Sequence, residues 1–298
     1  MLEIKKYGAI DIGSNAIRLL VSNVIVEEDK EPQFKKSSLV RVPIRLGADA
    51  FVSGKISPEN TERMIDSMEA FKLLMKVHDV KKYKACATSA MREAENGQEV
   101  ASKILKETGI EIDIIDGKKE AAIISSTDLS ELIESDGSYL YVDVGGGSTE
   151  FTVFSKGKIV NSKSFKMGTV RLINNKKSVN KAMFKEVEKW IKQNTKDLKR
   201  VAVIGSGGNI NKLFKMSGRA IGKPISYIYL NAQYQFLKQM NYSDRISELS
   251  LNPDRADVIV PATKIYLSAM KWSGSRKIFV PKIGLSDGII KSLYYNKL

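Results

Sequence analysis

Two short segments place acidic side chains beside a turn of small residues, a pattern suited to phosphate and metal chemistry. In residues 139–154 (YLYVDVGGGSTEFTVF), one apolar run ends at Asp143 and a second begins after Glu150. The turn between the runs holds Gly145, Gly146, Gly147 and Ser148. Successive amides in such a turn point into one concavity, which suits a phosphate group. Carboxylates beside a phosphate repel it unless a cation lies between them, so Asp143 and Glu150 are predicted ligands of Mg²⁺ or another divalent cation.

Residues 7–24 (YGAIDIGSNAIRLLVSNV) repeat this pattern, with Asp11 in the position of Asp143. The turn of this copy holds Gly13, Ser14 and Asn15. A single glycine turn is explained equally well by a hairpin with only a structural role. Two copies with matched aspartates favour two similar half-molecules that face each other across a cleft.

A third turn of this kind follows an apolar strand at 201–204 and contains Gly207 and Gly208. A helix opens directly behind it, which is a common way to present helix amides to an anion. On its own this signal is weak.

Arg92 follows a predicted strand at 83–88 that ends in hydroxyl side chains. A guanidinium at the carboxyl end of a strand is well placed to bind phosphate oxygens. Arg92 also has Glu95 near it in the sequence, so a surface ion pair is the alternative.

Glu120 lies in the first turn of a helix predicted to run from Lys118 to about Glu134. A carboxylate at this position interacts favourably with the helix dipole, which gives it a structural role. The functional alternative is a general base, and the spacing does not decide between the two.

The remaining pattern predicts a succession of strands and helices that flank these turns. Further strands are expected at 34–45, 111–115, 162–167 and 277–280. Helices are expected at 57–78, 182–198, 234–240, 254–271 and 284–295. A polar turn after the strand at 83–88 is expected to lead into a further helix that runs through Lys106. Residues 174–181 are polar and are expected to be mobile.

Length and composition predict a two-domain α/β protein with a boundary near residue 124. The chain has 298 residues, enough for two cores, in domains 1–124 and 125–298. One cysteine and one histidine, Cys86 and His78, exclude an intramolecular disulfide framework and a histidine-based metal site. The sequence lacks an apolar run of membrane-spanning length, so a cytoplasmic location without a membrane partner is expected.

The net charge of +14 comes entirely from residues 125–298, which contain 28 Lys and Arg against 14 Asp and Glu. A basic surface attracts polyanions, and nucleic acid, an anionic membrane and polyphosphate all qualify. A solvated lysine-rich surface explains the same composition.

The motifs together resemble the exopolyphosphatase and guanosine pentaphosphate phosphohydrolase family, within the superfamily of sugar kinases, acetate kinase and actin. The segments that carry the resemblance are the two Asp–Gly hairpins, ATSAMREAENG, IIDGKKEA, VDVGGGSTE and IGSGGN, in that order. The resemblance implies two ribonuclease-H-like (actin-like) domains, each a mixed sheet flanked by helices, with the active site in the interdomain cleft. It also implies that the last helix, about 284–298, packs back on the first domain.

Residue by residue, the resemblance implies that Glu120 is the catalytic glutamate and that Arg92 binds substrate. Asp143 and Glu150 match the metal site. The predicted phosphate-binding residues are Asp11, Gly13, Ser14, Asn15, Arg92, Gly145, Gly146, Gly147, Ser148, Gly207 and Gly208. Two positions depart from the family pattern: Lys119 replaces a glutamate and Ala122 replaces an arginine.

The predicted function is Mg²⁺-dependent hydrolysis of the terminal phosphoanhydride of inorganic polyphosphate. Guanosine pentaphosphate is the alternative substrate, and the sequence does not separate the two. An actin-fold kinase and a non-catalytic polyphosphate or nucleotide sensor also stay open. No specific nucleic-acid partner is expected, and a homodimer is suggested by the resemblance alone. Longer relatives carry a further C-terminal helical domain that extends the polymer channel, so processivity on long chains is in question.

Overall fold

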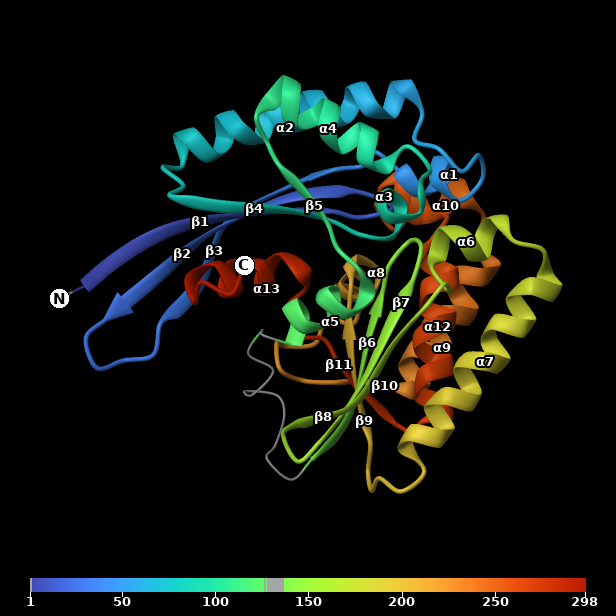
Figure 1. The fold of residues 1–298 in the computed structure, drawn as a ribbon. Coiled ribbons are helices and arrows are strands. Elements are labelled where there is room, and N and C mark those ends of the chain that lie inside the picture. The colour runs from blue at the N-terminus through green and yellow to red at the C-terminus, as the bar shows by residue number, and fades with distance from the viewer. Residues whose placement is uncertain (1, 126, 128–136) are drawn as a thin grey trace. The chain divides into compact units, whose positions relative to one another are not determined.

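The computed structural model describes residues 2–125, 127 and 137–298, which form two compact units, each built on one sheet (Figure 1). The first unit contains the chain up to Thr127 together with Gly284–Leu298, and the second contains the described residues between them. None of the helices in these ranges is long and apolar enough to cross a membrane.

The sheet of the first unit has five strands in the order β3-β2-β1-β4-β5. The strands are β1 Leu2–Ile12, β2 Ile17–Glu27, β3 Gln33–Val42, β4 Lys82–Ala87 and β5 Ile112–Ile114. The first three are antiparallel, whereas β4 and β5 run parallel to β1. One face carries the apolar core, in which Ile10 and Ile12 pack with Met64, Met68 and Phe71. The methionine and phenylalanine positions recur at helical spacing, which is why they share one buried side of a helix.

The described residues of the first unit form six helices. They are α1 Leu46–Ala50, α2 Pro58–Val77, α3 Ser89–Glu93, α4 Gly97–Thr108, α5 Gly117–Ser125 and α13 Leu285–Tyr294. The helix α2 begins as predicted, because the Ser57 side chain accepts the amide hydrogen of Asn60. The predicted helix through Lys106 is α4, and the polar turn predicted before it contains the short helix α3, which ends in extended backbone at Ala94. The predicted extension of α5 toward Glu134 lies outside the described residues.

The last helix, α13, packs within the first unit against β1 and α5. Tyr294 makes edge contacts with Tyr7 and Phe34. At Gly288 an added Cβ would lie 2.2 Å from the carbonyl oxygen of Ile123. This close approach holds α5, the helix that carries Glu120, against the C-terminal segment.

The sheet of the second unit has six strands in the order β10-β11-β9-β6-β7-β8. The strands are β6 Ser138–Val144, β7 Thr149–Ser155, β8 Lys158–Phe165, β9 Ala202–Ser206, β10 Ile225–Ser226 and β11 Lys277–Phe279. The helices are α6 Thr169–Asn174, α7 Lys177–Thr195, α8 Gly208–Met216, α9 Tyr227–Gln239, α10 Tyr242–Ser247, α11 Pro253–Ala256 and α12 Ile259–Trp272.

The two sheets share one topology, β1, β2, β3, β4 and β5 corresponding to β6, β7, β8, β9 and β11. In each unit a three-stranded meander is followed by a short helix, a long helix and a strand parallel to the first. The repeat of the motifs therefore reflects a repeat of the fold.

Three predictions in the second unit are wrong in their boundaries. Residues 177–181 belong to α7 and are not irregular, and α9 begins seven residues earlier than predicted, at Tyr227. The predicted helix 254–271 is divided into α11 and α12.

Candidate functional site

The turn between β6 and β7 places Asp143 and Glu150 directly opposite each other on neighbouring strands. Side chains of directly paired residues project on the same face of a sheet. The same register pairs Asp143 with Ser206 on β9 and Glu150 with Ser164 on β8. Four polar side chains from four strands therefore form one row across the sheet.

Hydroxyl groups donate to both carboxylates of this row. The Oγ atoms of Ser148 and Ser164 lie 2.6 and 2.9 Å from Glu150 Oε1, and Glu150 is only 4 % exposed. The Oγ of Ser206 lies 3.1 Å from Asp143 Oδ2. The hydroxyls therefore orient the two carboxylates.

The donor set of this row has the chemistry of a site for a hard cation. Two carboxylates lie in register and are accompanied by hydroxyl oxygens, whereas within residues 2–125, 127 and 137–298 no group of three or more acidic, His or Cys side chains is placed to hold a metal. Mg²⁺ commonly takes one or two carboxylates and completes its shell with water and substrate phosphates. The residues present therefore fit Mg²⁺ in this mode of binding.

The carbonyl groups of the β6–β7 turn point toward α6. The amides of Thr169 and Val170 donate to the carbonyls of Gly145 and Gly146 at 3.0 and 2.9 Å, and Arg171 Nε donates to the carbonyl of Gly147 at 2.7 Å. A Cβ at Gly168 would lie 2.2 Å from the Gly146 oxygen, so only glycine allows this approach.

With their carbonyls bound to α6, the turn glycines have amides that can donate to a ligand. Gly146 and Gly147 are buried, and nothing in the described part of the chain accepts from their amides. Buried amides are rarely left without a partner in folded proteins, and a row of them is a typical anion cradle.

The third turn lies beside this row. Gly207 has φ of 112°, and a Cβ there would meet the Val144 oxygen at 3.0 Å and the Asp143 carboxylate at 3.4 Å. Glycine is required both by the backbone conformation and by the close approach. The Tyr266 hydroxyl donates to the carbonyl of Ser206 and so fixes the start of the turn. Burial, followed by the charge of Asp143, raises the pKa of Tyr266 and of Tyr141 well above 10.

The turn between β1 and β2 has a different side chain opposite its aspartate. Asp11 pairs across the strands with Arg18, whose Nη1 lies 2.7 Å from Asp11 Oδ2. The carbonyls of Ser14 and Asn15 accept the amides of Gly47 and Arg45 at 2.7 and 3.2 Å. Arg45 has the left-handed φ of 61°, an uncommon conformation that often marks functional sites.

Arg92 and Glu120 are brought together in the first unit. Arg92 Nη1 donates to the carbonyl of Ile115 at 2.7 Å and lies 4.0 Å from Glu120 Oε2. The alternative of an Arg92–Glu95 pair is not realised: the Glu95 carboxylate lies 3.5 Å from Lys55. Glu120 is 8 % exposed, so its carboxylate is largely shielded from water.

The first turn of α5 is anchored through Lys119, the residue before Glu120. Asp116 accepts the amide of Lys119 at 2.7 Å, and the Lys119 ammonium lies 2.7 Å from Asp113. The hydrogen bond to Asp113 raises the pKa of Lys119. Burial acts to raise the pKa of Asp113, but the hydrogen bond from Lys119 and the charge of Lys84 lower it overall. The departure at Lys119 thus has a local role in holding the helix start.

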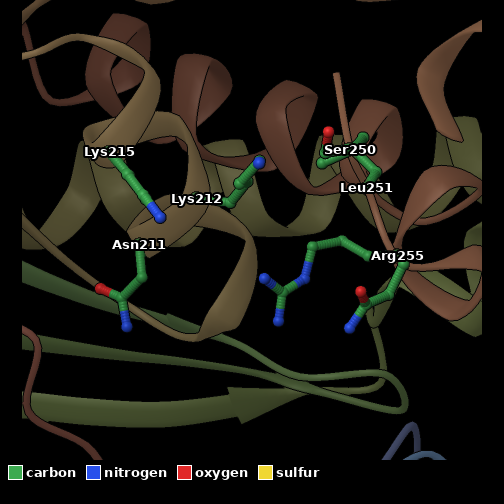
Figure 2. A pocket seen from close by; sticks show the side chains of 7 residues that line it. Asn211, Lys212, Lys215, Ser250, Leu251 and Arg255 are labelled. Carbon is green, nitrogen blue, oxygen red and sulfur yellow. The ribbon is translucent and has the colours of Figure 1, made fainter. Parts of the chain in front are cut away.

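A cavity of about 320 Å³ opens one helical turn beyond Gly208 (Figure 2). Lys215 from α8 and Arg255 from α11 line it, and Lys212 Nζ donates to the carbonyl of Leu249 at 3.1 Å. None of the lining side chains is acidic. The lining consists of Asn211, Lys212, Lys215, Ser250, Leu251, Asn252 and Arg255. Burial lowers the pKa of Lys212, and the charges of Lys215 and Arg255 lower it further. A lining with three cationic side chains and no carboxylate favours an anionic ligand.

The structure thus groups the predicted residues in three sets. The first contains Arg92 and Glu120 in the first unit, and the second joins the second and third turns in the second unit. The third is the first turn, with Asp11, Gly13, Ser14 and Asn15. Residues around these sets that were not predicted from the sequence are Arg18, Arg45, Gly168, Arg171, Ser164, Ser206, Lys212, Lys215 and Arg255. Only Lys212 and Lys215, one turn apart behind a glycine pair, left a signal in the sequence.

The chain is similar in sequence to proteins that are named as phosphatases. It is 28 % identical to the bifunctional 3-dehydroquinate synthase/phosphatase of Fusobacterium nucleatum over 91 % of the chain and 44 % of that protein. It is 31 % identical to exopolyphosphatase 1 of Mycobacterium tuberculosis over 49 % of the chain and 41 % of that protein. The chain therefore spans less than half the length of these two relatives.

Solved structures show the same fold. A Cytophaga hutchinsonii exopolyphosphatase superposes with a TM-score of 0.86 at 23 % identity, covering 98 % of both chains. An Aquifex aeolicus member of the Ppx/GppA family superposes with a TM-score of 0.78 at 22 % identity, covering 99 % of both chains. Residues 24–297 match the sequence pattern of the Ppx/GppA phosphatase family. These residues include the whole second set and both Arg92 and Glu120. Because this match extends over nearly the whole chain, the chain belongs to the Ppx/GppA phosphatase family.

Proposed function

We propose that this protein hydrolyses the terminal phosphoanhydride of inorganic polyphosphate and releases orthophosphate, with a divalent cation as cofactor. The observation that carries the proposal is the Asp143–Glu150 pair beside the buried turn amides of Gly146 and Gly147. A phosphate oxyanion would meet amide donors on one side and a cation on the other. Two relatives named exopolyphosphatase 1 and exopolyphosphatase 2 support this choice of substrate.

In this proposal Glu120 accepts a proton from the attacking water. The water oxygen forms a new bond to the terminal phosphorus while the bond to the bridging oxygen breaks, and the shortened chain keeps that oxygen. Arg92, 4.0 Å from Glu120, holds the substrate phosphate close to the base. The turn amides bind the equatorial oxygens, where charge spreads in the transition state. A bound Mg²⁺ would neutralise part of that charge.

The direct test is orthophosphate release from polyphosphate chains of defined length, with Mg²⁺ and with the metal chelated. Glu120→Gln is nearly isosteric and is expected to lower kcat by about 10²–10⁴-fold while substrate binding persists, because general base catalysis contributes that much. Metal-dependent release that the variant abolishes supports the proposal. Wild-type turnover in the variant would show that Glu120 is not the base.

Guanosine pentaphosphate is the second candidate, and the basic cavity favours it. The cavity lies on α8, the helix that begins at the third turn, and Lys212, Lys215 and Arg255 could receive a second phosphorylated position of a nucleotide. A 25 % identical relative is named guanosine-5'-triphosphate,3'-diphosphate pyrophosphatase and comes from Vibrio parahaemolyticus. Lys215→Ala with Arg255→Ala should raise KM for guanosine pentaphosphate and leave KM for tripolyphosphate unchanged if this candidate is right.

The same assay addresses the two remaining alternatives. Transfer of the ATP γ-phosphate to an acceptor other than water would indicate a kinase. Tight binding of polyphosphate with no release from any substrate would indicate a sensor.

A further inference from the structure

We propose that a row of lysines on α7 binds the trailing part of a long polyphosphate chain; this inference rests on the proposed function. The row consists of Lys177, Lys181, Lys185 and Lys189, each four residues from the next and each exposed. At 1.5 Å per residue they extend over about 18 Å of the helix. The buried positions Val187 and Ile191 lie on the other side of α7, so the row faces solvent.

The charges of this row are not balanced by acidic neighbours. Two glutamates of α7 are engaged elsewhere, Glu186 with Lys163 and Glu188 with Lys192. Among the described residues no carboxylate forms an ion pair with the four lysines of the row. Exposed helices commonly place a glutamate four residues from a lysine, and here lysine follows lysine.

The arrangement opposes the stability of the helix itself. Like charges four residues apart repel. Helix α7 has Lys176 as its N-cap, begins at Lys177 and has no acidic residue in its first turn. Cations at this end also oppose the helix dipole. Because all of these contributions have the same sign, a bound polyanion relieves them together.

The row begins close to the proposed phosphate turn. Helix α6 donates its first amides to the carbonyls of the β6–β7 turn, and only Asn175 and Lys176 separate α6 from α7. From there α7 runs along the second unit away from the turn (Figure 1). A polymer whose end is held at the turn can therefore continue along the row.

The chemistry of the row favours inorganic polyphosphate over single-stranded nucleic acid. Proteins that bind single strands combine cations with aromatic platforms for the bases. The aromatic residues of α7, Phe184 and Trp190, pack against the apolar core instead. A chain of phosphates needs only the cations.

The experiment compares two quadruple variants in a Glu120→Gln background that prevents turnover. The first replaces Lys177, Lys181, Lys185 and Lys189 by Gln. The matched control replaces Lys158, Lys223, Lys238 and Lys271, four exposed lysines of the same unit, and so removes the same charge. Calorimetry across a salt series gives Kd for long polyphosphate, for tripolyphosphate and for single-stranded DNA, and circular dichroism checks the fold.

The row variant is expected to bind long polyphosphate about tenfold more weakly, with a shallower salt dependence, and to bind tripolyphosphate normally. The control is expected to stay within about twofold of the parent. An equal loss of affinity for long polyphosphate in both variants would contradict the proposal, because it would show that only the net charge of the protein matters. An equal loss for DNA and polyphosphate would make the row a nucleic-acid surface, and an unchanged affinity for long chains would exclude it. Binding through the row without hydrolysis by the wild-type protein would refute the proposed function alone.

Discussion

The two glycine hairpins have similar backbone hydrogen bonds but carry different charged side chains opposite the aspartate. In the first, the amide of Gly13 donates to the carbonyl of Ala16 at 3.1 Å, and in the second Gly145 donates to Ser148 at 3.0 Å. In both, the carbonyls of the turn accept from the start of a following short helix. We propose that the repeated backbone serves as a phosphate cradle in each unit.

The residue opposite the aspartate is what differs. Asp11 faces Arg18 and forms an ion pair, whereas Asp143 faces Glu150 and forms a pair of like charges. In the first hairpin Arg18 balances the charge of Asp11, and we propose that a cation does so in the second. We infer that the same type of turn has a different role in each unit. The side chain opposite the aspartate determines whether the turn binds a metal ion.

The largest effect is expected from giving the second hairpin the side chain of the first. Glu150→Arg would pair with Asp143 and replace the cation, which should lower metal-dependent turnover by at least about 100-fold, since a metal contributes several kcal/mol to such reactions. Phosphate release at saturating Mg²⁺ measures the effect. Glu186→Arg, on the exposed side of α7, is the control. Retained activity in Glu150→Arg would remove Glu150 from the cation site.

An intermediate effect on turnover is expected from removing Arg171, which supports the β6–β7 turn. Arg171→Ala removes the donor to the Gly147 carbonyl, so the turn amides should lose their fixed direction and kcat should fall about tenfold. Added guanidinium should restore part of the rate. Arg276→Ala, an exposed arginine of the same unit, should change nothing. Lost activity in Arg171→Ala that guanidinium does not restore, accompanied by a lower melting temperature, would point to a role in folding only.

The first hairpin predicts an effect on stability without an effect on the metal. Arg18→Ala leaves Asp11, which is 7 % exposed, without its counter-charge and should lower the free energy of unfolding by about 1–2 kcal/mol. Chemical denaturation measures the change, and Arg18→Lys should recover part of it. Weaker cation binding by Arg18→Ala would contradict the division of roles between the hairpins.

The smallest effect is expected from substitution of Cys86, the residue that lies beside Asp11 on the neighbouring strand. Cys86 pairs with Asp11 where Ser206 pairs with Asp143. Burial, followed by the charge of Asp113, raises the pKa of Cys86 to about 12. The thiol should therefore stay unreactive toward a disulfide reagent at pH 8 until the protein unfolds. Cys86→Ser should cost about 1 kcal/mol or less, because Asp11 can accept from the new hydroxyl. Fast labelling of the native thiol would contradict the burial.

The hairpins could be predicted because local chemistry specifies them. Alternating apolar residues, an aspartate and a glycine turn determine strand, turn and strand within twenty residues, as the register from Ile12 to Ile17 shows. The start of α7 was missed because residues 174–181 contain little apolar signal, and the helix there depends on packing farther along, at Val187 and Ile191. The start of α9 had a signal in Ser226, which caps the amide of Tyr229.

The predicted site residues came from motifs, whereas their partners come from tertiary structure. Glu120 and Arg92 meet because α3 and α5 follow neighbouring strands, which no spacing of 28 residues could reveal. Arg171 contacts Gly147 only because β8 returns the chain to the turn. The identity of Arg18 was visible in the sequence, but its pairing with Asp11 required the strand register.

Cation binding by the separate hairpins tests the central claim most directly. Mn²⁺ binding can be followed by electron paramagnetic resonance in the wild-type protein and in three variants, Asp143→Asn, Glu150→Gln and Asp11→Asn. The two substitutions in the second hairpin should each weaken Mn²⁺ binding by about tenfold or more, and Asp11→Asn should leave it unchanged. Equal weakening by Asp11→Asn, or full binding by Asp143→Asn, would contradict the assignment of the cation to the second hairpin.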